Sequence, residues 1–502
     1  MSFLLPLVIF FLFFFHLIKS YNINYHINDK TFFPYQQKHQ IKKKKKNYIK
    51  YDGKGIILLK DSKEGNSLNF KVEDFLCESE KKEKNKNKES HGSFFFQTNT
   101  TFSELNIHKL LIENLKNHNI NTPSVIQYDL LKYYDEHNDN LQNIIIAAEN
   151  GIGKTLSYII FLINHILKKG TNKNTCTLIL QYNNLLCNQC YDLLKKLSKN
   201  VKAQIVNLKY EGIINIKNHL IVICTPVRLI SYIKEDKENV FSTFFENLDF
   251  LIMDEVDILF DNPYIRNMKI IFDELNKLKN EKSVSIITSS TLCNKGKKSI
   301  YNNVIKYITN PIVIKTNYFH NIHPFINYHF IKASNYYIKN KVQIIKHILS
   351  KQNYKKVLIF CNTLKSSNTA FSLLKLHFDN IFLFNSTVTK EDQTIILNHF
   401  KNSQNPILVT TDIIYRGIDI SNISHLFHFD TPTNIVVYTH RNGRLARGAN
   451  TGHVYIFKHF EDLVTRKIYE LHKNKLKFEE IFSRKRSLRK NYKRELQKKS
   501  EK

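Results

Sequence analysis

Short apolar runs alternate along this chain with longer stretches of helical character, and this alternation limits the folds open to it. The runs are nearly continuous in Ile, Leu and Val, which is typical of strands buried on both faces of a parallel sheet. Strands that alternate with helices form right-handed βαβ units. The sequence therefore predicts an α/β fold. The first group of strand candidates is residues 143–147, 177–181, 219–226, 248–255 and 284–290.

A second group of apolar runs follows a predicted linker after residues 310–316. These runs have the same character, but none leads into a glycine-rich loop. The 502 residues are enough for more than one large core. We therefore expect two α/β domains, at 96–312 and 313–475. The second group of strand candidates is residues 356–363, 380–386, 407–413, 425–430 and 453–457.

The segment AAENGIGKT follows the first of these strands and precedes a helical stretch. Chemistry in a parallel sheet lies at the carboxyl ends of its strands. Glycines let backbone N–H groups turn onto phosphate oxygens, the lysine reaches the β- and γ-phosphates, and the threonine hydroxyl binds Mg²⁺. The alternative is a plain strand-to-helix turn. The predicted phosphate-binding residues are Ala148, Glu149, Asn150, Gly151, Ile152, Gly153, Lys154 and Thr155.

A pair of carboxylates, Asp254 and Glu255, ends the apolar run LDFLIM. Asp254 is predicted to hold Mg²⁺, directly or through water, and Glu255 to orient and deprotonate an attacking water. The alternative is an acidic helix N-terminus that the helix dipole favours. Together with the phosphate loop, the pair predicts hydrolysis of ATP with Mg²⁺.

Several short motifs of the chain resemble the signature motifs of one protein family. DEVD (254–257) differs from DEAD at one residue, TPVR (225–228) resembles TPGR, SST (289–291) resembles SAT, and PSVIQ (123–127) resembles the Q-motif. YTHRNGRLARG (438–448) matches YxHRxGRxxR. Over residues 102–457 the chain resembles a DEAD-box RNA helicase. The resemblance implies two tandem RecA-like domains, each a mainly parallel sheet flanked by helices, which close over ATP and RNA.

The resemblance also implies roles for single residues. Gln127 would read the adenine edge and Phe102 would stack on it, and Asp419 would approach the ribose from the second domain. Arg444 and Arg447 would be arginine fingers, which suit phosphate because a guanidinium pairs with it bidentately. The residues implied to couple the ATP and RNA sites are Ser289, Thr291, His440 and Arg441. The implied RNA contacts are Thr225, Arg228, Thr363, Thr411, Arg416 and Gly417.

Some positions depart from the family pattern. Asn183 and Asn184 stand where the family has the Arg and Glu of PTRELA, and Lys390 and Gln393 replace its Q-x-x-R. The groups needed for hydrolysis all match, so the departures affect RNA contacts and packing.

The ends of the chain predict targeting. Residues 1–20 read as a signal sequence, followed by a basic, Asn-rich leader at 21–95. This order resembles the bipartite presequence of proteins sent to the parasite plastid, the apicoplast, and the Lys- and Asn-rich composition resembles that of AT-rich malaria-type genomes. The alternatives are secretion or a retained membrane anchor. Under the targeting hypothesis, the protein would meet a membrane only while it travels along the secretory route. A basic tail is expected at 476–502.

The formal net charge of +31 points to a polyanionic partner. The favoured hypothesis is an ATP-dependent RNA helicase or RNP remodeler that unwinds short duplexes, with low RNA sequence specificity and an RNP or ribosomal precursor as a candidate target. The alternatives are an ATP-gated RNA clamp or scaffold with little unwinding, and a DNA helicase of the same superfamily.

Overall fold

In the computed structural model the chain forms two units, residues 1–48 and 49–502. All the residues that the structure describes belong to the unit 49–502. The predicted signal sequence lies outside the described residues, as do most of the leader and all but three residues of the basic tail. The described residues are 56–60, 67–75, 100–170, 175–212, 218–235, 240–261, 263–278, 283–293, 299–333, 336–413, 420, 422–445, 451–458 and 462–478.

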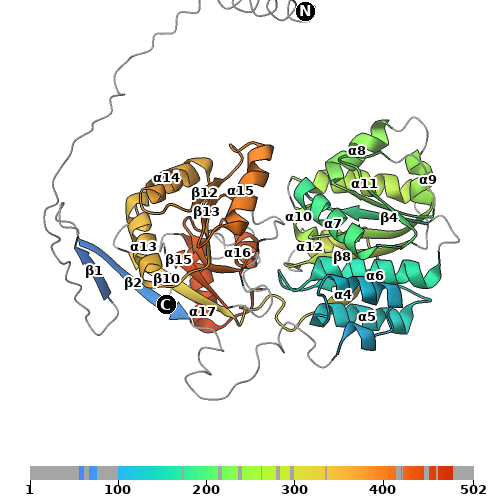
Figure 1. Ribbon diagram of the computed structural model, residues 1–502, viewed down its shortest axis with the longest axis horizontal. Coiled ribbons are helices and arrows are strands. Elements are labelled where there is room, and N and C mark those ends of the chain that lie inside the picture. The colour runs from blue at the N-terminus through green and yellow to red at the C-terminus, as the bar shows by residue number, and fades with distance from the viewer. Residues whose placement is uncertain are drawn as a thin grey trace, which may run out of the picture. The chain divides into compact units, whose positions relative to one another are not determined.

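The first sheet is parallel throughout, as the buried apolar runs predict (Figure 1). The strands that carry the predicted site are neighbours, so their carboxyl ends meet at one edge. In spatial order the sheet comprises β5 (Ala203–Asn207), β6 (His219–Cys224), β4 (Thr175–Leu180), β7 (Leu248–Met253), β8 (Val284–Ser289), β3 (Ile144–Ala147) and β9 (Ile312–Lys315).

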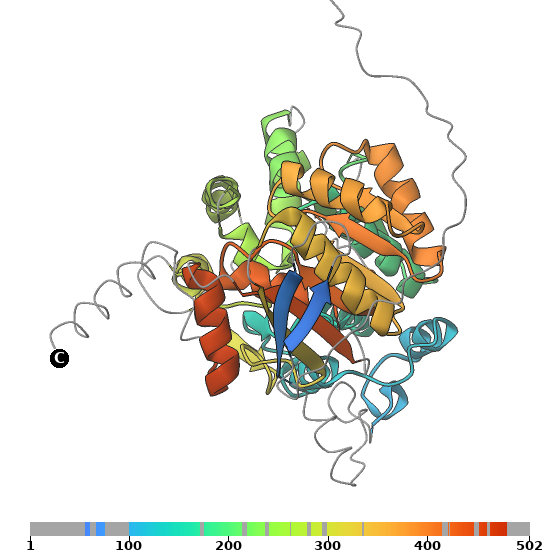
Figure 2. The ribbon, with the colours of Figure 1, turned by 90° about the vertical axis from the view of Figure 1, so that its left-hand side faces the viewer.

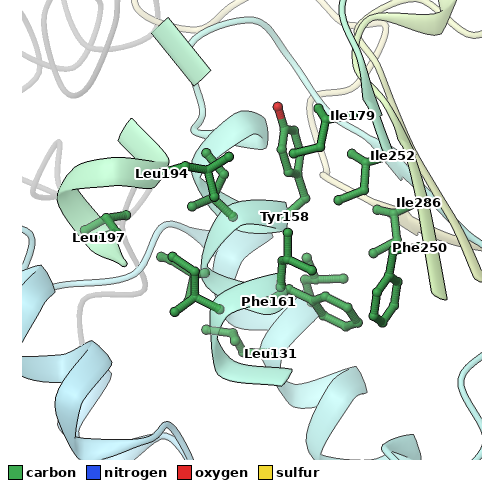
Figure 3. Packing of buried hydrophobic residues seen from close by; sticks show 14 of the residues in the cluster. Leu131, Tyr158, Phe161, Ile179, Leu194, Leu197, Phe250, Ile252 and Ile286 are labelled. Carbon is green, nitrogen blue, oxygen red and sulfur yellow. The ribbon is translucent and has the colours of Figure 1, made fainter. Parts of the chain in front are cut away.

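Helices pack on both faces of this sheet, each over its own hydrophobic cluster. Figure 3 shows part of one cluster, where Tyr158 and Phe161 of α6 lie against Phe250 and Ile252 of β7. One face is covered by α4 (Lys109–Asn117), α5 (Val125–His137), α6 (Lys154–Lys169) and α7 (Asn184–Leu197). The other is covered by α8 (Pro226–Glu235), α9 (Val240–Glu246), α10 (Val256–Leu259), α11 (Ile265–Leu278) and α12 (Ile300–Val304).

The second sheet is parallel from β10 to β12, with an antiparallel hairpin added at its β10 edge. In spatial order it comprises β1 (Ile56–Lys60), β2 (Ser67–Phe75), β10 (Ile326–Ala333), β15 (Gly452–Phe457), β14 (Ile423–His428), β11 (Lys356–Phe360), β13 (Ile407–Thr410) and β12 (Ile381–Phe384). One face packs on α13 (Ile338–Lys351) and α14 (Leu364–Lys375), and the other on α15 (Lys390–Asn402), α16 (Ile435–Asn442) and α17 (Leu463–Asn474).

Two predicted boundaries differ from the structure. The strand Ile312–Lys315 pairs with β3, so the first domain extends past residue 312. The segment Ser67–Phe75 lies inside the predicted leader, yet it pairs with β10 and belongs to the second sheet. The strand β9 is short and lies at the edge of its sheet, whereas β2 lies between β1 and β10 and carries charged side chains that dilute the apolar pattern. Among the described residues, no helix is long and apolar enough to cross a membrane.

Candidate ATP site

The phosphate-binding loop joins β3 to α6, as predicted. Gly151 and Gly153 have φ angles of 85° and 97°, in the left-handed region that favours glycine. A Cβ on Gly153 would lie 2.5 Å from Gln127 Nε2, so this position has no room for a side chain. The helix α6 begins at Lys154, which places its N-terminal N–H groups beside the loop.

Lys154 is 5% exposed, and the loop surrounds its ammonium group. Its Nζ donates to the carbonyl oxygens of Ala148 at 3.1 Å and Glu149 at 3.2 Å, and to Asn150 Oδ1 at 3.3 Å. Glu255 Oε1 lies 3.7 Å from the same nitrogen. Within the described part of the chain, the acceptors around this buried cation are loop oxygens and one carboxylate, an arrangement that suits a site for phosphate.

Glu149 connects the loop to the end of the first domain. Thr316, which directly follows β9, donates from Oγ1 to Glu149 Oε2. Burial raises the pKa of this carboxyl, although the hydrogen bond from Thr316 acts in the opposite direction.

Asp254, at the predicted metal position, accepts hydrogen bonds from residues of several elements. Its Oδ2 accepts from Thr155 Oγ1 at 3.0 Å, Tyr158 OH at 3.1 Å and Gln181 Nε2 at 3.0 Å, while Thr288 Oγ1 donates to Oδ1. A carboxylate and a hydroxyl held in contact are the hard oxygen ligands that Mg²⁺ prefers. The residues present therefore fit the predicted metal.

Glu255 begins α10 with a φ of 55°, an unusual value for a residue with a side chain. Such strain persists where the surroundings enforce it. Here its N–H donates to Thr288 Oγ1 at 3.0 Å, and Ser290 Oγ donates to its Oε2 at 3.0 Å. Burial raises the pKa of Glu255, against the attraction of Lys154. A carboxylate with a raised pKa accepts protons more readily, which suits a general base.

Asp257 and His440 join the two domains. His440 Nε2 lies 3.0 Å from Asp257 Oδ2, and both side chains are buried. Burial alone would raise the pKa of Asp257, but the charge of His440 and its hydrogen bond outweigh this and lower it. Asn150 Nδ2 lies 3.4 Å from the other ring nitrogen of His440.

These contacts form one closed ring across both domains. Ser290 Oγ completes it, because it lies 3.2 Å from Asp257 Oδ2 as well as 3.0 Å from Glu255 Oε2. The predicted hydrolytic residues Lys154 and Glu255 are therefore connected to the predicted coupling histidine through intervening side chains. The ring passes through Lys154, Asn150, His440, Asp257, Ser290 and Glu255.

Arg441 holds the second domain together. It is fully buried, and it donates to Asp412 Oδ1 at 2.6 Å, Asn362 Oδ1 at 2.7 Å and the Asp430 carbonyl at 3.1 Å. It thus ties the ends of β11, β13 and β14 to α16. Its hydrogen bonds named here lie within the second domain, whereas His440 of the same motif contacts the first domain.

The remaining predicted ATP contacts have mixed outcomes. Arg444 lies in the turn after α16 and is 6% exposed, whereas Arg447 and Asp419 lie outside the described residues. Gln127 accepts from Ser124 N–H at 2.9 Å and reaches the Gly153 carbonyl at 3.4 Å, so it lies against the phosphate loop. Phe102 is 2% exposed and belongs to the core cluster, and its contact with an adenine stays a prediction.

The predicted coupling residues of SST lie beside the phosphate loop and DEVD. Ser289 is fully buried, and its carbonyl accepts from Ala148 N–H at 3.1 Å. Thr291 Oγ1 donates to Asp257 Oδ2. Strand β8 therefore connects β3, with its loop, to the carboxylates after β7.

Three of the predicted RNA contacts, Thr225, Arg228 and Thr363, lie at the starts of helices. Thr225 Oγ1 accepts from Arg228 N–H at 3.4 Å, and the guanidinium of Arg228 lies 4.5 Å from the Tyr232 ring centre and donates to the Leu208 carbonyl at 3.0 Å. Thr363 caps α14, and Thr411 follows β13. Arg416 and Gly417 lie outside the described residues.

Sequence reasoning missed several residues of this site. Tyr158, Gln181 and Thr288 hold Asp254, and they look like core residues in the sequence because each lies within or beside an apolar run. Asp257 and Ser290 are part of the quoted motifs, but no role followed from the motifs alone. A strand-end position was the available signal for Gln181 and Thr288, since both follow buried strands or end them.

Comparisons with known proteins agree with this site. Residues 126–299 match the family model described as DEAD/DEAH box helicase, and residues 340–449 match the helicase conserved C-terminal domain. The chain is 28% identical over 342 residues to the ATP-dependent RNA helicase DBP6 of Vanderwaltozyma polyspora, covering 62% of this chain and 51% of that protein. It is 26% identical over 368 residues to the probable ATP-dependent RNA helicase MG425 homolog of Mycoplasma pneumoniae, covering 71% and 78%.

Solved structures share the fold. One is the DEAD-box helicase Mss116 bound to ssRNA and UDP-BeF, with a TM-score of 0.61, 21% identity, and coverage of 75% of this chain and 78% of that one. The chain spans about half the length of the first curated relatives that it matches. The two family models together cover more than half of the sequence, from the phosphate loop to the HRxGR motif. With Asp257 of its DEVD motif hydrogen-bonded to His440 of the HRxGR motif, the chain belongs to the DEAD-box family of helicases.

Proposed function

We propose that this protein is an RNA-dependent ATPase that remodels RNA or RNPs by closing its two domains over ATP and an RNA strand. The observation that carries the proposal is the ring of contacts between Lys154, Glu255 and His440. Closure brings groups of the second domain to the phosphates, so hydrolysis depends on both domains.

The cofactor assignment rests on the loop and on Asp254. Lys154 and the N-terminus of α6 would hold the phosphates of ATP, and Thr155 with Asp254 would hold Mg²⁺, directly or through water. Bound Mg²⁺ supplies charge neutralisation at the transferred phosphoryl group. Glu255 is placed beside Lys154 to accept the proton of the attacking water.

RNA is the proposed polyanion. Relatives are named as RNA helicases, the net charge is +31, and Arg228 holds a guanidinium at the start of α8 where it would reach a phosphate. Contacts to the backbone imply low sequence specificity. Salt-dependent affinity is expected from the excess of Lys and Arg. The target would be an RNP or ribosomal precursor.

The test measures ATP hydrolysis by the purified full chain with Mg²⁺, with and without single-stranded RNA. Single-stranded DNA serves as a second polyanion. Stimulation by RNA that is lost in Glu255→Gln supports the proposal, and equal stimulation by DNA would contradict the choice of RNA. A matched control is Glu274→Gln, a carboxylate that pairs with Lys277 on α11 away from the loop.

Unwinding and clamping share these groups, so kinetics must separate them. An unwinder releases a short duplex strand during turnover. A clamp keeps both nucleotide and RNA bound for many seconds and does not separate the strands of a duplex. Release of a labelled strand from a short duplex, measured beside the dissociation of single-stranded RNA, distinguishes the two.

For location we propose delivery to the apicoplast by the signal sequence and basic leader, with a membrane as partner only on that route. The support is the order of an apolar segment and a basic, Asn-rich segment before residue 67. Residues 1–66 fused to a fluorescent protein in a plastid-bearing parasite would test it. Retention in the secretory pathway or at a membrane would contradict it.

A further inference from the structure

Strand β2 precedes the first domain in the chain, yet it completes the sheet of the second. Residues 70–75 pair antiparallel with β10, from Phe70 opposite Ala333 to Phe75 opposite Tyr328. Figure 2 shows the blue strand β2 beside the second domain, and Figure 1 shows it next to β10.

Side chains of β2 alternate between two faces. On one face Phe70 is 2% exposed in the cluster over α13, and Asp74 Oδ1 lies 2.7 Å from His329 Nδ1. The hydrogen bond from His329 lowers the pKa of Asp74, against the effect of burial. This face packs in the cluster that contains α13, whereas α16, the helix that bears His440, belongs to the cluster on the opposite face of the sheet.

The other face of β2 contacts α17. Tyr469 OH donates to Glu73 Oε2 at 2.7 Å, and Lys458 Nζ lies 3.3 Å from the same oxygen. The ring of Phe75 meets those of Tyr469 at 5.9 Å and His472 at 6.1 Å between centroids. Two residues of this strand therefore fix one side of α17.

Helix α17 in turn contacts α16. Tyr438 OH and His472 Nε2 lie 2.7 Å apart, and both residues are buried. Tyr438 stands two positions before His440 in α16. A continuous set of contacts thus runs from Phe75 through His472 to the helix that presents His440 and precedes Arg444.

We propose that Glu73 and Phe75 of β2 position α16 through α17, so that one face of the upstream strand supports ATP hydrolysis. This inference rests on the proposed function. Phosphoryl transfer depends on placement, and a misplacement of about 1 Å can reduce the rate about 100-fold. Phe75 and Glu73 act as positioning residues because neither touches the ATP site.

The test compares point variants of the full chain. Phe75→Ala should lower kcat for RNA-stimulated hydrolysis about tenfold. The KM for ATP should stay within about twofold, because the phosphate loop and Gln127 belong to the first domain. Phe75→Tyr keeps the ring and should restore kcat. Asp74→Asn is the matched control, since it alters the other face of the same strand, and its kcat should stay near that of the unchanged protein.

Coupling is measured with Tyr438→Phe, which removes the hydrogen bond to His472. If both residues act on α16 through the same contacts, the double variant Phe75→Ala with Tyr438→Phe should lose little more than the single variants. Fully additive losses would overturn the proposal. So would an equal loss of kcat in Asp74→Asn, which would indicate a general effect of strand docking.

A readout independent of catalysis separates this inference from the proposed function. Amide hydrogen exchange of residues 435–442 should speed up in Phe75→Ala but not in Asp74→Asn, whatever the ATPase activity. Unchanged exchange in α16 would overturn the positioning role. An unchanged protein without RNA-stimulated hydrolysis would instead contradict the proposed function.

Discussion

His440 Nε2 and Asp257 Oδ2 lie 3.0 Å apart, although the two residues belong to different domains. His440→Ala should remove this link and lower RNA-stimulated ATP hydrolysis at least about tenfold, because the second domain loses its contact with the carboxylates. ATP binding should persist, since Lys154 and its loop are unchanged. Hydrolysis and nucleotide binding are measured side by side. His399→Ala, at an exposed position on α15, is the control, and an equal effect there would contradict the interpretation.

Gly443 lies against the phosphate loop, and a Cβ there would come 2.2 Å from Asn150 Cβ. Gly443→Ala should therefore block the approach of the end of α16 and reduce hydrolysis, while the melting temperature stays close to normal. Gly212→Ala is the control, because its added Cβ would meet Tyr232 OH at an ordinary 3.6 Å. A fully active Gly443→Ala protein would show that hydrolysis does not require this close contact.

Tyr158 donates to the predicted metal carboxylate, at 3.1 Å from Asp254 Oδ2. Residues that hold a metal ligand typically change metal affinity 10- to 100-fold when altered. Tyr158→Phe should raise the Mg²⁺ concentration needed for half-maximal hydrolysis about tenfold, and removal of Mg²⁺ with EDTA should abolish the reaction. A Mg²⁺ titration of the ATPase rate is the measurement. An unshifted titration would mean that Thr155, Gln181 and Thr288 hold Asp254 without help.

Buried neutral histidines predict sensitivity to mild acid. Unfolding exposes them and restores a pKa near 6.5, so below that pH the unfolded state binds more protons and stability falls as pH falls. Each such histidine lowers the free energy of unfolding by up to about 1.4 kcal/mol per pH unit of acidification. Burial lowers the pKa to about 3 or about 4 in His165, His219, His323, His425, His428 and His472.

Thermal melting between pH 7 and pH 5 tests this expectation. The melting temperature should fall steadily below pH 6.5. His165→Phe should lessen the dependence, because His165 packs among the rings of Tyr134, Phe161 and Phe250 and a phenyl ring does not titrate. A melting temperature that is flat across this range would contradict the assignment of neutral buried histidines.

Removal of the leader should spare β2. Phe70 is 2% exposed in the core of the second domain, so a protein cut beyond it would lose a buried aromatic ring and expose the β10 edge. Losing a buried Phe typically costs about 3–5 kcal/mol. We expect the N-terminus of the mature protein to fall before residue 67. Mass spectrometry of the N-terminal peptide of the native protein measures it, and a start beyond Phe75 would contradict this.

The sequence predicted the parallel sheets and the phosphate loop because both depend on local patterns. Continuous apolar runs mark strands buried on both faces, and Gly153 with Lys154 marks a loop that needs left-handed backbone and a buried cation. The roles of Tyr158 and Gln181 could not be read in the same way. Each looks apolar or neutral in its own segment, and its contact with Asp254 arises only when β4, β7 and α6 pack together.

The strand β2, which lies between β1 and β10, escaped prediction for a related reason. Its Lys71, Glu73 and Asp74 resemble the charged leader around it, and the partners of the two acids lie more than 250 residues away in the chain. Phe102 is a residue for which the resemblance and the packing point to different surroundings. A family resemblance implied a ligand contact, but local packing places its ring in the core.

The hydrogen bond between Thr316 and Glu149 has a mechanical consequence. Thr316 directly follows β9 in the segment that leads toward the second domain, and it is anchored to the phosphate loop itself. Thr316 therefore ties the segment after β9 to the phosphate loop, and we expect any movement of Glu149 on ATP binding to reach this segment.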